Sequence, residues 1–108
     1  MASRHSVAWT STAAADLAAI IEYIASGDRS AALKAFDRIE ASAASFRFHP
    51  ARGRFVPELR PFAVRVYREV VVAPWRIIYR MAASEVRVLA VLDGRRDLED
   101  TLLERLLR

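Results

Sequence analysis

The residues with the clearest chemical potential in this sequence are its arginines. The chain has 17 basic residues, of which only Lys34 is a lysine. A guanidinium group stays charged and presents a planar set of donors that matches phosphate and carboxylate groups. Arg76 and Arg80 lie four residues apart in one apolar segment, and Arg87 lies in the next. This spacing would let the arginines bind one anion together, or it places ordinary charges on a solvated face.

Glu58 is the carboxylate with the most interesting surroundings, because Arg52 and Arg54 precede it in a proline-rich segment. A carboxylate in such a position can act as a base, or it can order its loop as an ion-pair partner. Both interpretations stay open. His5 and His49 have no partner at metal-ligand spacing, and the chain has no cysteine. The absence of cysteine excludes disulfides, thiolate zinc sites and cysteine nucleophiles, and we expect no metal or other cofactor.

The whole chain carries an excess of positive charge. Its formal net charge at pH 7 is +4 and its pI is about 10.3. Such an excess favours an acidic partner, either a nucleic acid or an acidic protein. Residues 1–7 contain no apolar signal segment, and no apolar run is long enough to span a bilayer. We therefore expect a cytoplasmic protein without membrane contacts, in a single domain that covers residues 1–108.

Two helices are predicted in the first half of the chain. Apolar residues recur at helical spacing over residues 17–24 and again over residues 33–46. The hydroxyl residues at 10–12 suit the N-cap of the first helix, and Asp28 or Ser30 suits that of the second. The second helix should end near Phe48, before a proline. Because so few residues join the helices, we expect an antiparallel hairpin.

The second half of the chain alternates with a period of two, which is typical of strands. A short first strand is predicted over residues 7–9, and a loop over residues 50–63. Three strands should follow over residues 64–73, 75–81 and 85–92, and then a short terminal helix over residues 97–107, capped by Asp97. The order β-α-α-β-β-β-α predicts a two-layer α+β fold with the helical hairpin packed on an antiparallel sheet. The opposite sheet face should be partly open to water.

Alternation along residues 75–81 decides which side chains share a face. The apolar set of this strand must face the helices, so Arg76 and Arg80 should lie on the open face, with Arg87 on the neighbouring strand. Arg95 and Arg96 follow the last strand at its rim. The face is either a concave surface for a polyanion or an acidic protein segment, or an ordinary solvated sheet face.

Several segments resemble the RelE/ParE toxin superfamily, in the same order along the chain. The resemblance begins at Trp9 before a capped helix with Asp16-Leu17, and continues at His49-Pro50 after the second helix. It is carried further by Gly53-Arg54-Phe55-Val56-Pro57-Glu58-Leu59, Tyr67-Arg68-Glu69-Val70, Trp75-Arg76-Ile77-Ile78-Tyr79-Arg80 and the segment from Val86 to Leu98. The superfamily has the β-α-α-β-β-β order that the periodicity predicts.

This resemblance implies a growth-inhibiting toxin of a type II toxin–antitoxin pair. A cognate antitoxin, partly disordered when free, would wrap and neutralise the toxin, and operator DNA would be bound only through that antitoxin. We expect the antitoxin to contact Arg80, Arg87 and three leucines of the terminal helix, which are Leu102, Leu103 and Leu106.

Two mechanisms divide the superfamily. RelE-like members cut messenger RNA on the ribosome, whereas ParE-like members inhibit DNA gyrase and need no such catalysis. If the chain is a nuclease, the resemblance makes Arg76 the contact to the scissile phosphate, Glu58 the base and Arg95 a further catalytic group. Contacts to the target or to nucleic acid would come from Arg54, Arg68, Arg76, Arg80, Arg95 and Arg96.

The sequence departs from the nuclease pattern at the end of its last strand. Nuclease members commonly have a histidine or tyrosine there, where this chain has Arg95 and Arg96, and the lysines that other nuclease members use are absent. Arginine does not readily donate or accept a proton near neutral pH. We therefore favour inhibition of gyrase, with a ribosome-dependent mRNA endonuclease as the alternative and a non-toxic nucleic-acid-binding or interaction module as a further one.

Overall fold

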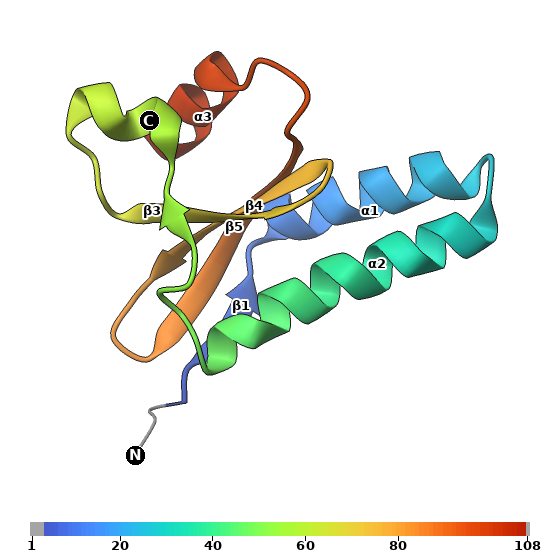
Figure 1. The fold of residues 1–108 in the computed structure, drawn as a ribbon, viewed down its shortest axis with the longest axis horizontal. Helices are drawn as coiled ribbons and strands as arrows, with labels where there is room; N and C mark the ends of the chain where they lie inside the picture. Colours follow the sequence, from blue (N-terminus) through green and yellow to red (C-terminus); the bar gives the residue numbers. More distant parts are fainter. Residues whose placement is uncertain (1–3, 108) are drawn as a thin grey trace.

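The computed structural model describes residues 4–107, which form an α+β fold around a five-stranded sheet (Figure 1). Two 3-10 helices, η1 and η2, accompany the α-helices and strands. In chain order the elements are β1 (Ser6–Trp9), α1 (Ser11–Ala25), α2 (Arg29–Ala44), η1 (Ser45–Arg47), β2 (Arg54–Phe55), η2 (Pro57–Phe62), β3 (Tyr67–Val72), β4 (Trp75–Met81), β5 (Glu85–Asp93) and α3 (Glu99–Leu106). None of the helices described is long and apolar enough to cross a membrane.

The strands of the sheet follow the order β1-β5-β4-β3-β2. β3, β4 and β5 form the antiparallel meander that the sequence predicts. β1 pairs in parallel with β5 at one edge, and the two residues of β2 pair with β3 at the other. The register between β4 and β5 shifts at Ile78 and Tyr79, which is typical of a β-bulge.

The helical hairpin packs on one face of the sheet, as predicted (Figure 1). Thr10 Oγ1 accepts the N–H of Ala13 at 3.1 Å and Asp28 Oδ1 accepts the N–H of Ala31 at 3.0 Å, so the predicted caps are confirmed. α2 ends at Ala44, earlier than expected, because the chain tightens into η1. The turn end of the hairpin extends beyond the sheet (Figure 1).

The opposite face of the sheet is less open than the sequence predicts. Residues 50–63 are not simply a loop, because they contain β2 and η2. η2 and α3 cover the middle of this face and close a second apolar cluster, formed by Val56, Leu59, Ile78, Ala90, Leu92, Leu98 and Leu102. Asp97 is not the N-cap of α3; Leu98 has that position, and the Asp97 carboxylate accepts the N–H of Glu99 at 3.2 Å.

Candidate functional site

Arg76 lies on the predicted face of β4, but it is buried instead of exposed. Its side chain meets two carboxylates, and only 8% of the residue is accessible. Nη1 and Nη2 donate to the two oxygens of Glu58 at 2.6 and 2.7 Å, and Nε donates to Glu69 Oε1 at 2.8 Å. The expectation that Arg76 projects into water is therefore wrong, because η2 carries Glu58 over it.

Glu69 extends this cluster to a second arginine. Arg54 donates to Glu69 Oε2 through Nε at 2.8 Å and Nη2 at 2.7 Å, while the Glu69 residue is only 1% accessible. Two guanidinium groups thus face two carboxylates, and their charges cancel. A buried carboxylate needs such partners, since an unpaired ion in the interior is strongly unfavourable. We call Arg54, Glu58, Glu69 and Arg76 the ion-pair cluster.

The electrostatics of the ion-pair cluster oppose proton transfer. The hydrogen bonds from Arg76 hold the pKa of Glu58 below its usual value, despite partial burial. The same bond to Glu58 raises the pKa of Arg76. A general base that works near neutral pH needs a pKa close to that pH and access to the proton it takes. In this arrangement both oxygens of Glu58 are already bound to Arg76.

Arg95 lies next to the ion-pair cluster, at the end of β5. A cleft of about 580 Å³ is lined by Arg54, Glu58, Arg76 and Arg95, with no histidine, tyrosine or lysine among its described lining. Arg95 is exposed and donates to Asp93 at 2.8 and 3.0 Å, and these bonds lower the pKa of Asp93 to about 2. Arg96 is also exposed but does not line the cleft.

Arg80 and Arg87 form a separate feature at the other end of the same sheet face. They are register partners across β4 and β5, and Tyr67 of β3 pairs with Arg80 in the same row. Both arginines are exposed and line a cleft of about 440 Å³ with Tyr67, Arg105 and Leu106. The second apolar cluster lies between Arg80 and the buried Arg76. The predicted single arginine face is therefore divided into two separate sites.

The wall of this second cleft is α3, which is held from both sides. Tyr67 Oη donates to the carbonyl of Leu106 at 2.9 Å, and Arg105 donates to the carboxylate of Asp16 at 2.7 and 3.0 Å. Leu102 is fully buried beneath the helix, whereas Leu103 is partly buried. The prediction that the antitoxin contacts Leu102 does not fit this position, because the side chain is buried in the second apolar cluster.

The family of the chain follows from comparison with known proteins. A sequence profile described as "ParE toxin of type II toxin-antitoxin system, parDE" matches residues 7–98. The chain belongs to the ParE toxin family. A solved structure from P. aeruginosa, titled "Chromosomal ParDE TA system", matches this ParE-family toxin with a TM-score of 0.67 and 26% identity, over 83% of this chain and 96% of that one. No curated protein matches the chain.

In this ParE-family toxin the predicted site residues do not form one constellation. Arg54, Glu58, Arg76 and Arg95 lie at one cleft, Arg80 and Arg87 lie at another, and Arg68 lies at the β2 edge of the sheet. Within residues 4–107, no group of three or more His, Asp or Glu side chains is arranged to hold a metal ion.

Arg68 was predicted as a contact to the target or to nucleic acid, but its neighbours were not predicted from the sequence. The Arg68 guanidinium lies over the ring of Phe55, 4.3 Å from its centroid, and donates to the carbonyl of Gly53 at 2.8 Å. Arg60 lies in the segment that was expected to be a loop, and Arg65 in the segment that was expected to be a strand; both are exposed and line a hollow with Phe55. The alternation of arginine with phenylalanine in this segment was the available signal.

Proposed function

We propose that the toxin stops growth by inhibiting DNA gyrase, without cleaving RNA, until a cognate antitoxin neutralises it. Membership of the ParE family supports the toxin role, and the ParE-like mechanism needs no proton transfer. Gyrase lies in the cytoplasm, so the proposal places the toxin there as well.

The observation that carries this proposal is the enclosure of Arg76 between Glu58 and Glu69. Cleavage of RNA at a 2′-hydroxyl requires a base, an acid and a group that stabilises charge on the phosphate. Arg76 would stabilise that charge only after it released two carboxylates, and a phosphate beside Glu58 would meet a like charge. A RelE-like endonuclease is therefore the less favoured alternative, and a module without toxicity leaves the family membership unexplained.

The proposal is tested with purified gyrase and supercoiled plasmid. We expect the toxin to inhibit supercoiling or to trap gyrase in complexes with cleaved DNA, and we expect messenger RNA on programmed ribosomes to stay intact at the same toxin concentration. Ribosome-dependent cleavage of the message with unaffected gyrase would support the RelE-like alternative and contradict the proposal.

For the antitoxin we propose a protein segment that carries acidic side chains into the cleft of Arg80 and Arg87. Directly opposed like charges destabilise a pair of strands, and no carboxylate among residues 4–107 forms an ion pair with Arg80. A carboxylate between the two guanidinium groups would relieve this repulsion. Arg87 and Arg105, which line the cleft with Arg80, already pair with Glu85 and Asp16. Among the described residues Arg80 is thus the cleft arginine that still lacks a carboxylate, which suits one acidic side chain of a peptide better than a continuous phosphate backbone.

The double variant Arg80→Ala/Arg87→Ala tests this cleft. Hydrogen bonds to charged groups contribute about 1.5–3 kcal/mol each, so we expect affinity for the antitoxin encoded beside the chain to fall at least about tenfold. The matched control is Arg4→Ala/Arg47→Ala, which removes the same charge from exposed positions elsewhere. Equal affinity of wild type and the cleft variant, measured by titration calorimetry, would contradict this assignment.

A further inference from the structure

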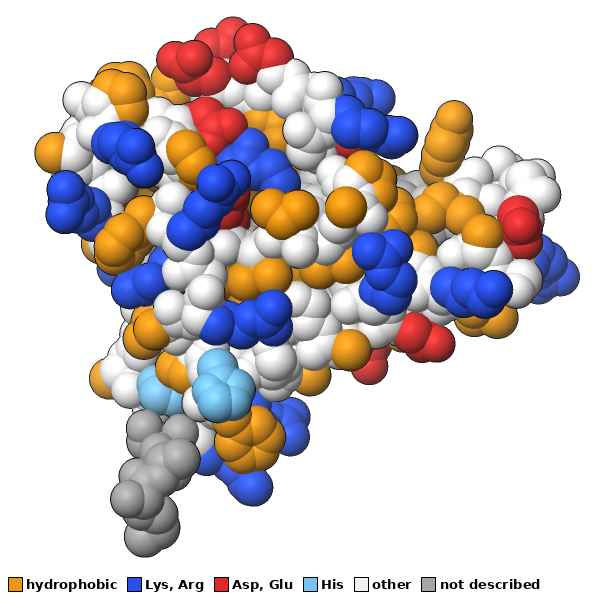
Figure 2. All heavy atoms as spheres, in the orientation of Figure 1, with side chains coloured by type: hydrophobic (Ala, Val, Ile, Leu, Met, Phe, Trp, Pro, Cys, Tyr) orange, Lys and Arg blue, Asp and Glu red, His pale blue; other side chains and the backbone are white. Residues whose placement is uncertain are grey.

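The β2 edge of the sheet carries an exposed group of aromatic and basic side chains that neither proposal above uses. We call it the edge patch, and it consists of Phe55, Arg60, Phe62, Arg65 and Arg68. Phe55 and Phe62 are 39% and 51% accessible, although large apolar side chains tend to be buried. Figure 2 shows that Lys and Arg side chains gather over η2, β2 and the start of β3, at the left of the molecule, whereas acidic side chains gather over α3 at the top.

The arginines of the edge patch lack the counter-charges that the arginines of the ion-pair cluster have. No carboxylate of the described chain forms an ion pair with Arg60, Arg65 or Arg68, and Arg68 is held by the carbonyl oxygens of Ala51 and Gly53. In contrast, Arg54 and Arg76 are neutralised within the ion-pair cluster. The positive charge of the patch is therefore free to attract an anion from solution.

A small hollow connects the charged and the apolar parts of the edge patch. Its volume is about 250 Å³, and its lining comprises Phe55, Val56, Arg60, Val64 and Arg65. Three apolar side chains and two arginines thus line the same hollow. A ligand that fits must combine flat apolar faces with closely spaced negative charges.

We propose that the edge patch is a binding site for single-stranded nucleic acid. Arg60, Arg65 and Arg68 contact successive phosphates, while bases stack on Phe55 and Phe62. Basic grooves with exposed aromatic rings bind single strands in this way, because every base has a face that can stack. The guanidinium of Arg68 over Phe55 adds a second planar surface.

The geometry favours a single strand over two other ligands. A duplex keeps its bases stacked on one another, so the exposed rings would have no base face to contact. An acidic peptide would have to add to the sheet edge or bind through charge alone, and β2 offers only two residues for a ladder. Inhibition of gyrase was proposed without reference to this site, so the inference goes beyond the proposed function.

The test is fluorescence anisotropy with a labelled oligothymidylate of about 12 nucleotides, a length within the usual site sizes. For Arg60→Ala/Arg65→Ala we expect affinity to fall roughly twentyfold at 0.1 M salt. We also expect the slope of log K against log salt concentration to be less steep by ~1.4, because each of the two lost phosphate contacts contributes about 0.7. For Phe62→Ala we expect weaker binding with an unchanged salt dependence. All three side chains are exposed, so these substitutions should leave the fold intact, and circular dichroism checks this.

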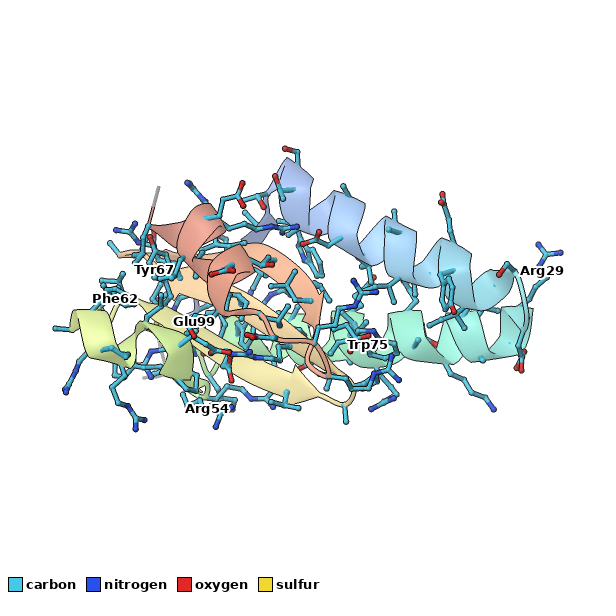
Figure 3. All side chains as sticks on the ribbon, turned by 90° about the horizontal axis from the view of Figure 1, so that it is seen from above. Arg29, Arg54, Phe62, Tyr67, Trp75 and Glu99 are labelled. Atoms are coloured by element: carbon cyan, nitrogen blue, oxygen red, sulfur yellow. The ribbon has the colours of Figure 1, made fainter. Side chains whose placement is uncertain are left out.

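The matched control is Arg29→Ala/Lys34→Ala, which removes the same charge from the turn end of the helical hairpin. Figure 3 shows Arg29 at this end and Phe62 at the opposite end of the molecule. We expect the affinity of this control for the oligonucleotide to fall by less than about twofold, since charges this far from the edge patch are screened by salt. Three results would each overturn the inference. The two double variants could lose the same affinity, a duplex of the same length could bind as tightly as the single strand, or equimolar hexaglutamate could displace the oligonucleotide fully. None of these outcomes bears on the gyrase assay, which measures a separate activity.

Discussion

At the scale of single residues, the environment of Arg76 determines what it can do. The resemblance to nuclease members predicted that Arg76 contacts a phosphate. The surroundings of Arg76 do not favour that contact, because Glu58 and Glu69 already accept from the donors that a phosphate would need. A buried arginine with two carboxylates connects the η2 segment to the sheet, so its first effect is on stability.

This role predicts that Arg76→Ala destabilises the toxin instead of only silencing it. Glu69, which has no accessible side-chain surface, would keep Arg54 as its single partner. Removing one member of a buried ion pair costs about 3 kcal/mol, and we expect that loss in the free energy of unfolding, measured with urea. The control Arg95→Ala removes an exposed arginine and should leave stability nearly unchanged. Wild-type stability of Arg76→Ala would contradict the structural role.

The pKa of Glu58 gives a second prediction at this scale. Arg76 lowers the pKa of Glu58 in the folded protein, so the ionised carboxylate stabilises the fold at pH values above the unfolded pKa near 4.5. This contribution is lost as the pH falls through the lower pKa of the folded protein. Glu58→Gln cannot titrate there. The stability gap between wild type and Glu58→Gln should therefore be widest at pH 6 and narrow below pH ~4.5, in urea titrations over this range. A constant gap from pH 6 to pH 3 would refute this.

At the scale of elements, α3 is a structural part of the toxin and also the wall of a cleft. Leu98 and Leu102 pack into the second apolar cluster, and polar contacts fix the helix to β3 and α1. The repetition of leucine indicated an amphipathic helix, but it did not show what the apolar side would cover. That side covers the sheet, which leaves partly exposed leucines for a partner.

The placement of α3 predicts different effects for two leucines of the same segment. Leu102→Ala should lower the free energy of unfolding by about 2–5 kcal/mol, since it empties a fully buried position. Leu107→Ala should have little effect, because Leu107 is 40% accessible. Thermal or urea unfolding checks both variants, and similar small effects would mean that α3 does not cover the sheet.

At the scale of the whole molecule, the toxin separates its functional surfaces. The cleft of Arg80 and Arg87 lies beside α3, the edge patch lies at β2, and the turn end of the hairpin exposes Tyr23 and Leu33. An exposed apolar surface of this kind is typical of a protein that binds a partner. The flat shape, 40 × 37 × 21 Å, gives a small chain room for these separate surfaces.

Hydrophobic periodicity was sufficient to predict the α-helices, the meander and the order of these elements, although not β2, η1 or η2. It failed where structure depends on contacts between distant segments. β1 was predicted as a strand, but its parallel pairing with β5 has no local signal. η2 was missed because its two prolines suggested a loop, although Pro57 occupies a first-turn position that tolerates proline.

The candidate site was harder to predict than the fold. Strand alternation placed Arg76 and Arg80 correctly on the same face, but it could not show that Glu58 covers only one of them. Glu69 was the overlooked signal, since an acidic residue inside a valine-rich strand needs a counter-charge when it is buried.

The most direct test of the proposed mechanism is to induce the toxin in cells without its antitoxin and to follow DNA and messenger RNA together. We predict gyrase-dependent DNA breaks and a DNA-damage response while messages stay intact, because Glu58 and Arg76 of the ion-pair cluster are bound to each other. Rapid cleavage of messages on ribosomes, before any DNA damage, would contradict the central claim.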